Sequence, residues 1–457
     1  MSQETSASPK AAGDVRPGRL RGGAIGGLGA AVLAMAFMGP ATSVAFNTPP
    51  AAAKIGFALP FGILLAMLVC LIMASTIGAF SSKLPSAGFA YTFNTQAFGK
   101  GAGFTSGWIL VLAYGAVGPM LFSAMGGFGN QFLVSQFKLN VPWWLISAVI
   151  LAIIWFIGSL GVSSSAKTAM IFLTLEVGVL LGLFATIIGK GGASGNTVAA
   201  FDPAHSLTGV SGIGFGMLWG ILMFVGFESA GTLGEETRNP RRAVPRALFF
   251  AVILIGIVYV LSGYAAAIGF GENHVHALAT DASPWTTLAT RFWGADGVWL
   301  ITLTVLNSQF ANVLSGSSAA VRIIFSAVVT FALGAWITPF GAYDFLGSIL
   351  GLGIIVLYIL MNLGLITYFQ RHYRSEFSPV RHGVLPILGS LLLLLPIYGQ
   401  LWPIPPWPYN LVPYLILAWT IGGIGYFLYL TRRRPAMVEA MGRVWEPDPG
   451  PAGDATP

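Results

Sequence analysis

The chain has 457 residues, of which 55% are hydrophobic and only 9% are charged, and its net charge is +7. This composition excludes a soluble enzyme, because so many apolar side chains need lipid as their solvent. The basic residues lie between apolar runs rather than in one patch, so they indicate membrane topology and no nucleic-acid partner. With a single cysteine, Cys70, the chain can form neither an internal disulfide nor a cysteine-based metal site.

Apolar runs of about 18 to 25 residues recur along the chain, and each can cross a hydrocarbon core of about 30 Å as a helix. After a polar segment, 1–21, which we expect to be a cytoplasmic tail, we predict an all-α polytopic protein with about 12 transmembrane helices. The predicted spans are roughly 22–46, 57–81, 103–130, 142–162, 167–189, 211–233, 246–269, 299–325, 326–341, 345–370, 383–400 and 410–431. A second cytoplasmic tail is expected at 432–457.

The distribution of Lys and Arg supports this topology in a cell membrane with both termini in the cytoplasm. Most basic residues fall on the side of the tails, and the opposite side receives only Lys54, Lys138, Lys190 and Arg291. The region 299–341 is abnormally short for two crossings and has no polar loop. Two crossings preserve the charge bias, so we expect either a re-entrant hairpin or a loop that this sequence lacks.

Two spans are interrupted at comparable places. The first contains Gly39-Pro40, and the sixth contains Gly226-Phe227-Glu228-Ser229. Proline removes a backbone donor and glycine relaxes a helix. Each break lies in the first span of a block of five, and an odd block followed by its copy gives inverted topology. We therefore predict five-helix repeats at 22–189 and 211–370 and two additional helices at 383–431, inferred from positions alone.

The stretch from Phe224 to Arg246 reads FVGFESAGTLGEETRNPRRAVPR, and it resembles the sixth-helix signature of the amino acid-polyamine-organocation transporter superfamily. The segments KLPSAGFAY at 83–91 and GFTSGW at 103–108 are similar to the family's second-to-third helix connection. The resemblance covers most of the chain and is clearest before residue 250. It implies a 5+5 inverted repeat with two extra helices, a central site between the broken helices, and amino acids or related amines as substrates.

The breaks also predict that site on physical grounds. Free amides at the start of a half-helix attract an anion such as a substrate carboxylate, and the candidates are Thr42, Ser43 and Val44. Carbonyls around Phe224 and Val225 suit an ammonium group. The alternative is a kink used only for packing. The predicted substrate-binding residues are Gly39, Pro40, Ala41, Thr42, Ser43, Val44, Phe224, Val225, Gly226, Phe227 and Ser229.

Two acids, Glu228 and Glu176, lie within apolar spans, where an ionised side chain costs about 2.5 to 3.5 kcal/mol. We predict that both act in coupling or gating, and a structural hydrogen bond is the alternative for each. The superfamily pattern holds an acid at 228, in a form close to that of arginine/agmatine antiporters. Some proton-coupled relatives carry a lysine near 176, so the glutamate leaves the coupling ion open.

The eighth span carries polar side chains that could line a path or coordinate sodium, although such residues are also ordinary packing material. They are Asn307, Ser308, Asn312, Ser315, Ser317 and Ser318. All five histidines fall in predicted loops, and no HExxH or other metal-ligand spacing occurs. We therefore expect no catalytic residues, no metal and no cofactor.

The leading interpretation is a secondary active transporter that moves amino acids across the lipid bilayer by alternating access. Neutral amino acids are favoured because the predicted third span, 103–130, lacks an acid to hold a cationic side chain. A polyamine or organic-cation exchanger of the same fold, a channel and a receptor are the alternatives. Protons are the candidate coupling ion, and uniport, symport and exchange all remain open.

Overall fold

The computed structural model describes residues 26–84, 86, 88–159, 166–233, 237–316 and 320–441. The predicted tail 1–21 and most of the tail 432–457 lie outside these ranges. Every regular element in the described chain is a helix, which confirms the all-α fold class.

Eight helices make up the first half of the chain. The first predicted span is divided into two helices, and the third is divided in the same way at Ala116. In order, the helices are α1 (Gly27–Met38), α2 (Pro40–Ile55), α3 (Leu59–Lys83), α4 (Phe89–Phe98), α5 (Lys100–Gly115), α6 (Val117–Phe137), α7 (Trp143–Ser159) and α8 (Ala166–Gly189).

The second half begins with another divided span and includes two short helices, α12 and α13, that pair before α14. In order, the helices are α9 (Gly209–Phe224), α10 (Ser229–Thr232), α11 (Pro240–Phe270), α12 (Val275–Thr280), α13 (Pro284–Trp293), α14 (Ala295–Gly316), α15 (Ala320–Ile337), α16 (Pro339–His372), α17 (Leu385–Leu392), α18 (Leu394–Leu401), α19 (Val412–Arg433) and α20 (Pro435–Ala440).

Each predicted span coincides with a helix or a divided helix. By length and apolarity, 8 segments of the described chain can cross a membrane, and the first, Gly27–Lys83, runs through two predicted spans. The shorter apolar helices Trp143–Ile157 and Ile324–Ile337 fall on the predicted fourth and ninth spans. The chain is therefore a multi-pass membrane protein.

Two boundaries differ from the prediction. The first span continues beyond residue 46 to Ile55, through Pro49 and Pro50. The helix survives because each proline removes only its own amide, and the end of α2 is buried in the bundle. The eighth predicted span falls on a helix described from Ala295 to Gly316, and after residues 317–319, which lie outside the described ranges, the next helix begins at Ala320 rather than at 326. The ninth helix is accordingly 18 residues long.

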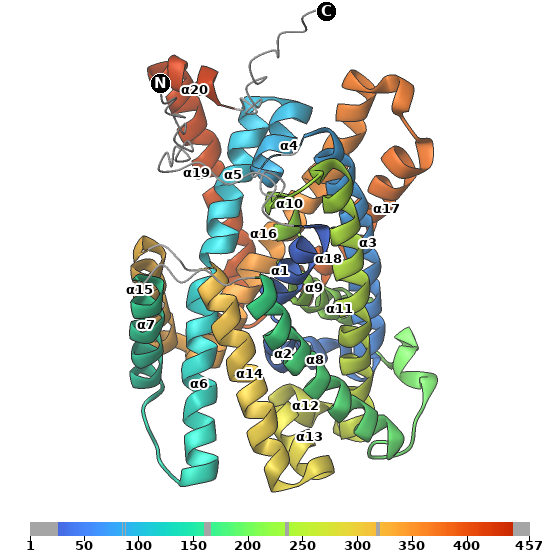
Figure 1. Ribbon diagram of the computed structural model, residues 1–457, viewed down its shortest axis with the longest axis vertical. Coiled ribbons are helices and arrows are strands. Elements are labelled where there is room, and N and C mark those ends of the chain that lie inside the picture. Colours follow the sequence, from blue (N-terminus) through green and yellow to red (C-terminus); the bar gives the residue numbers. More distant parts are fainter. Residues whose placement is uncertain are drawn as a thin grey trace, which may run out of the picture.

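The divided helices lie at the centre of the bundle. α2 packs along α9, α3 packs along α11, and α16 crosses both α5 and α6. α12 and α13 lie at one end of the molecule, and α4 and α20 lie at the other (Figure 1). This arrangement places both predicted breaks inside the protein.

Candidate substrate site between two broken helices

The first break is a left-handed turn at Gly39, whose φ is +53° and ψ is +68°. A Cβ atom at this position would lie 2.7 Å from Asn312 Nδ2, so both the turn and the packing require glycine. Side chains cap the carbonyls that the break leaves at the end of α1. Asn312 Nδ2 donates to the carbonyl of Phe37 at 3.0 Å. Ser43 Oγ donates to the carbonyl of Met38 at 2.7 Å.

Two of the three amides predicted to receive a carboxylate already have partners. The Thr42 amide donates to Ser308 Oγ at 3.2 Å, and the Ser43 amide donates to the Gly39 carbonyl at 2.8 Å. An anion at the start of α2 would therefore have to displace the Ser308 hydroxyl from Thr42. The Thr42 hydroxyl itself is buried and has no hydrogen-bond partner among the residues that the structure describes.

The second break separates α9 from α10. Gly226 has a φ of +115°, and a Cβ atom there would lie 2.6 Å from the ring of Phe37. The Phe224 carbonyl accepts from the Phe227 amide at 3.1 Å. Ser43 Oγ lies 3.4 Å from the carbonyl of Met223, in the last turn of α9. The two breaks predicted from distant parts of the sequence are thus in direct contact.

A small cavity of about 30 Å³ lies beside this contact. Of the predicted site residues, Thr42, Ser43 and Val225 line it. Its other polar lining residues are Asn47, Asn312 and Tyr343, and its apolar ones include Val117, Met120, Leu121, Leu222 and Leu350. This volume suits about one water molecule, so an amino acid enters only if the surrounding helices separate.

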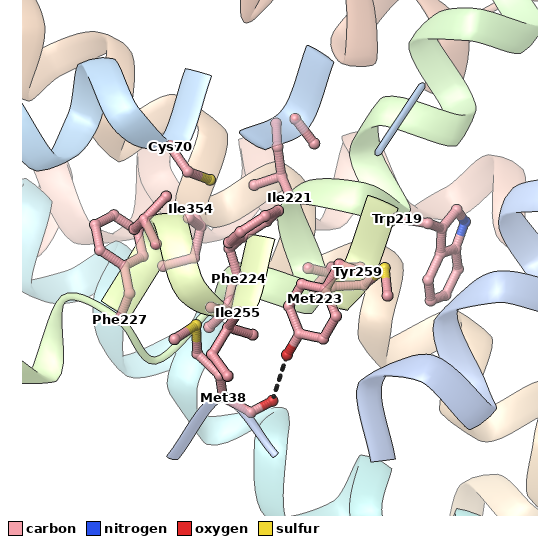
Figure 2. Close-up of a cluster of buried hydrophobic side chains, with 14 of the residues drawn as sticks. Met38, Cys70, Trp219, Ile221, Met223, Phe224, Phe227, Ile255, Tyr259 and Ile354 are labelled. Atoms are coloured by element: carbon pink, nitrogen blue, oxygen red, sulfur yellow. Dashed lines mark hydrogen bonds between the residues drawn. The ribbon is translucent and has the colours of Figure 1, made fainter. Parts of the chain in front are cut away.

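Phe224 and Phe227 belong to the apolar packing around the breaks and do not line the cavity. The Phe224 ring lies edge-on to the ring of Tyr259, with centres 5.1 Å apart. In Figure 2 the hydroxyl of Tyr259 points to the carbonyl of Met38, a distance of 3.4 Å. Phe227 packs edge-on against Tyr358 instead. These aromatic rings hold the two breaks together rather than facing a solute.

Glu228 lies in the second break and is almost completely buried, with 1% of its surface exposed. Its Oε2 accepts from the Gly226 amide at 3.0 Å, and its Oε1 accepts from the hydroxyl of Tyr114. Tyr114 is in the last turn of α5, directly before the division of the third span. The buried carboxyl therefore joins two interrupted spans.

Glu176 lies in α8 beside the first break and is also buried. Its carboxyl lies close to Ser308, the residue whose hydroxyl accepts from the Thr42 amide. Its Oε2 has no hydrogen-bond partner in the described part of the chain. Each break thus has one buried carboxyl next to it.

The polar side chains predicted in the eighth span are only partly described. Ser308 and Asn312 contact the first break, while Ser317, Ser318 and the side chain of Ser315 lie outside the described residues.

Comparison with known proteins identifies the family. The sequence profile of the family described as amino acid permease matches residues 25–329, more than half of the chain. The chain belongs to the amino acid permease family. Its members are membrane transporters rather than enzymes, as the resemblance of Phe224–Arg246 implied.

Individual relatives of this permease differ in the solutes that their names give. It is 24% identical to the branched-chain amino acid permease BcaP of Lactococcus lactis subsp. cremoris (strain MG1363), over 79% of this chain and 87% of the relative. It is 24% identical to the methylthioribose transporter of Bacillus subtilis (strain 168), over 83% of this chain and 87% of the relative. The low-affinity putrescine importer PlaP of Escherichia coli (strain K12) is 25% identical over 47% of each chain.

Three residues of the permease's site region escaped the sequence analysis. Besides Tyr114, Tyr343 in α16 donates to Asn47 Oδ1 at 2.8 Å, and Trp285 Nε1 donates to the carbonyl of Val44 at 2.9 Å. The only sequence signal is that a tyrosine or tryptophan within an apolar region needs a partner for its polar atom. That signal does not say which partner, because all three bond to residues far away in the chain.

Proposed function

We propose that this permease moves amino acids, and neutral ones in particular, by alternating access at the two breaks. The observation that carries the proposal is the cavity at their contact, which has backbone and hydroxyl groups of Thr42 and Ser43 on one side. Its other walls are mostly apolar, the polar side chains of Asn47, Asn312 and Tyr343 carry no charge there, and no acid is among its lining residues in the described chain. A cationic side chain would find no opposite charge there, whereas a neutral one would meet Val117, Met120 and Leu222. The name of BcaP agrees with this substrate class, and the name of PlaP supports amines as the alternative.

The contacts that close the cavity are few and polar, which suits a site that opens and closes. Ser43 links α2 to the carbonyl of Met223, and Asn312 links α14 to the carbonyl of Phe37. A substrate ammonium group could replace these donors at the two carbonyls, and a substrate carboxylate could replace the Ser308 hydroxyl as the acceptor from the Thr42 amide. Binding would then exchange protein contacts for substrate contacts as the helices separate.

Protons are the coupling ion that we propose, acting at Glu228 or Glu176. Glu228 accepts two hydrogen bonds, and a protonated carboxyl becomes a donor with less capacity to accept. Protonation would therefore weaken the bond to Tyr114 or to the Gly226 amide, and so loosen α5 from the second break. Glu176 would act through Ser308, which lies close to its carboxyl and accepts from the Thr42 amide.

Uptake into liposomes tests this proposal. Purified protein should give saturable uptake of a labelled neutral amino acid, and the same amino acid on the far side should stimulate uptake. A channel would show neither property. Competition by putrescine in place of amino acids would move the assignment to amines.

Ala41→Leu tests the position of the site, because Ala41 is fully buried at the start of α2 and a larger side chain fills the break. The variant should lose substrate binding while its melting curve in detergent stays that of a folded protein. Ala152→Leu, on an exposed face of α7, is the control. Normal binding by Ala41→Leu would place the site elsewhere.

A further inference from the structure

A second and larger cavity lies away from the two breaks. It has a volume of about 440 Å³ and shares no lining residue with the cavity at the breaks. Its walls come from the end of α11, the segment after α8, and the pair α12–α13, which lies at one end of the molecule (Figure 1). This volume falls within the range of small-molecule sites, about 300 to 1,000 Å³.

Two opposite charges face this cavity. Arg291, in the last turn of α13, donates from Nη1 to the carbonyl of Gly269 at 2.5 Å, and its guanidinium lies 5.6 Å from the centre of the Phe270 ring. These contacts fix the guanidinium but use only part of it, because arginine carries five N–H donors. The remaining donors suit a carboxylate, which arginine binds through two parallel hydrogen bonds.

Asp281 supplies the negative charge, and its orientation is also fixed. Its Oδ1 accepts from the Ser283 amide at 2.8 Å, and its Oδ2 accepts from Thr287 Oγ1 at 2.6 Å. An ionised carboxylate has about four acceptor positions, so two remain for a ligand. Within the described chain, no ion pair joins Asp281 to Arg291, although both line the same cavity.

We propose that this cavity binds a small zwitterion, a free amino acid, with its carboxylate on Arg291 and its ammonium group on Asp281. The two fixed charges face one space without neutralising each other, and a zwitterion pairs with both. Ala193, Phe270 and Ala277 give part of the remaining wall an apolar character that accepts an aliphatic side chain, and His274, Thr280 and Thr287 complete the wall. The inference does not depend on which solute crosses the membrane.

Occupation of this cavity would also reach the first break. Trp285 in α13 donates to the carbonyl of Val44 and to Thr48 Oγ1 at 3.0 Å, so α13 is attached to α2. A ligand between α11 and α13 would hold this pair of helices in place. The cavity is therefore positioned to make movement of α2 depend on the amino acid at this end of the protein.

The test measures binding of L-leucine to the purified full chain by equilibrium dialysis and calorimetry. Binding is measured in the wild-type protein and in the Ala41→Leu variant. The variant is included because it should lack the proposed central site. We expect one leucine per chain to remain bound in that variant. Arg291→Gln or Asp281→Asn should then weaken binding about tenfold or more, because each removes a charge-assisted contact.

The matched controls keep the same chemistry outside the cavity. Asp202→Asn changes another loop carboxylate that accepts from a backbone amide, and Lys100→Gln changes another cation that donates to a backbone carbonyl. Both should bind leucine normally. 3-Methylbutylamine and 4-methylpentanoate, which each keep one charge of leucine, should bind about tenfold or more weakly than leucine.

Hydrogen exchange gives a second readout, which is taken on the wild-type protein and on Ala41→Leu once its melting curve shows that it is folded. Leucine should protect backbone amides of residues 269–291 in the wild-type protein and in Ala41→Leu. The proposal is overturned if Ala41→Leu shows neither binding nor this protection. It is equally overturned if folded Arg291→Gln and Asp281→Asn bind as the wild type does, or if either single-charge analogue binds as tightly as leucine. Loss of binding only in Ala41→Leu would instead support the central site and not the outer one.

Discussion

A buried acid in a membrane helix must have donors, and Glu228 has two, the hydroxyl of Tyr114 and the amide of Gly226. Tyr114→Phe removes one donor and leaves a buried acceptor short of a partner. We expect it to lower the free energy of unfolding by about 1–3 kcal/mol. Combined with Glu228→Gln it should cost less than the sum of the single changes, because both disrupt the same bond. Thermal unfolding of the four proteins in detergent measures this, and additive losses would mean that the two residues act independently.

Glu228→Gln also tests proton coupling, since glutamine has the shape of the protonated acid without its ability to ionise. The variant should retain substrate binding, and its transport rate in liposomes should become nearly independent of pH. Asp202→Asn, a carboxylate change outside both breaks and both cavities, is the control and should keep the wild-type pH profile. If Glu228→Gln keeps that profile too, Glu228 is structural and Glu176 is the next residue to change.

Gly226 occupies a position that no other residue fits. Its φ of +115° disfavours a side chain, and a Cβ atom would lie 2.6 Å from the Phe37 ring and 3.0 Å from the Phe37 carbonyl carbon. Gly226→Ala should therefore push α1 and α9 apart and lower both the melting temperature and substrate affinity. Gly178→Ala in α8, where nothing lies within 4 Å of the new atom, should be neutral or slightly stabilising. Equal behaviour of the two variants in melting and binding assays would contradict the close contact.

Residues that stand out locally were predictable from the sequence, and those that depend on a distant partner were not. A Gly-Pro pair or an acid in an apolar run is anomalous whatever surrounds it, so Gly39, Glu176 and Glu228 could be identified without a structure. Tyr114 could not, because its importance comes from a carboxyl 114 residues away. Whether the predicted residues bind a substrate stays a prediction.

At the scale of elements, α12 packs against α2, and Trp285 of α13 adds side-chain hydrogen bonds to α2. Trp285 Nε1 reaches both the Val44 carbonyl and Thr48 Oγ1. Trp285→Phe keeps the ring but removes both hydrogen bonds, and we expect faster hydrogen exchange in residues 275–293 and a changed transport rate. Trp293→Phe in the same helix removes a bond to Thr186 of α8 and serves as the control. Unchanged exchange in Trp285→Phe would show that apolar packing alone attaches the pair.

Helix ends were less predictable than helix positions. An apolar run shows where a helix crosses the membrane, but the end of α2 at Ile55 depends on burial against neighbouring segments, which outweighs Pro49 and Pro50. In the region 299–341 the apolar character continues without interruption, so hydropathy could not separate the two helices there.

At the scale of the whole molecule, side chains connect distant segments at one end of the bundle. Lys83 forms an ion pair with Glu376 at 2.7 Å, which places the end of α3 next to the segment after α16. Lys100 Nζ donates to the Glu439 carbonyl at 2.9 Å and so joins α5 to α20. The end of α3 also reaches the start of α11, because a Cβ atom at Gly78 would lie 3.1 Å from Pro245. Segments predicted to share the cytoplasmic side therefore lie together.

This clustering leads to a prediction about topology. If α14 and α15 both cross, the start of α11 and the segment after α16 lie on the same side of the membrane, and that side should be the cytoplasm because it collects most Lys and Arg residues. In a protein with Cys70→Ala, an impermeant maleimide should not label Arg242→Cys or Arg374→Cys in intact cells but should label both in inside-out vesicles. Asn273→Cys, in the segment between α11 and α12, should show the opposite pattern. Labelling of Arg242→Cys and Arg374→Cys from opposite faces would mean that residues 299–341 cross the membrane once, because only an odd number of crossings separates them.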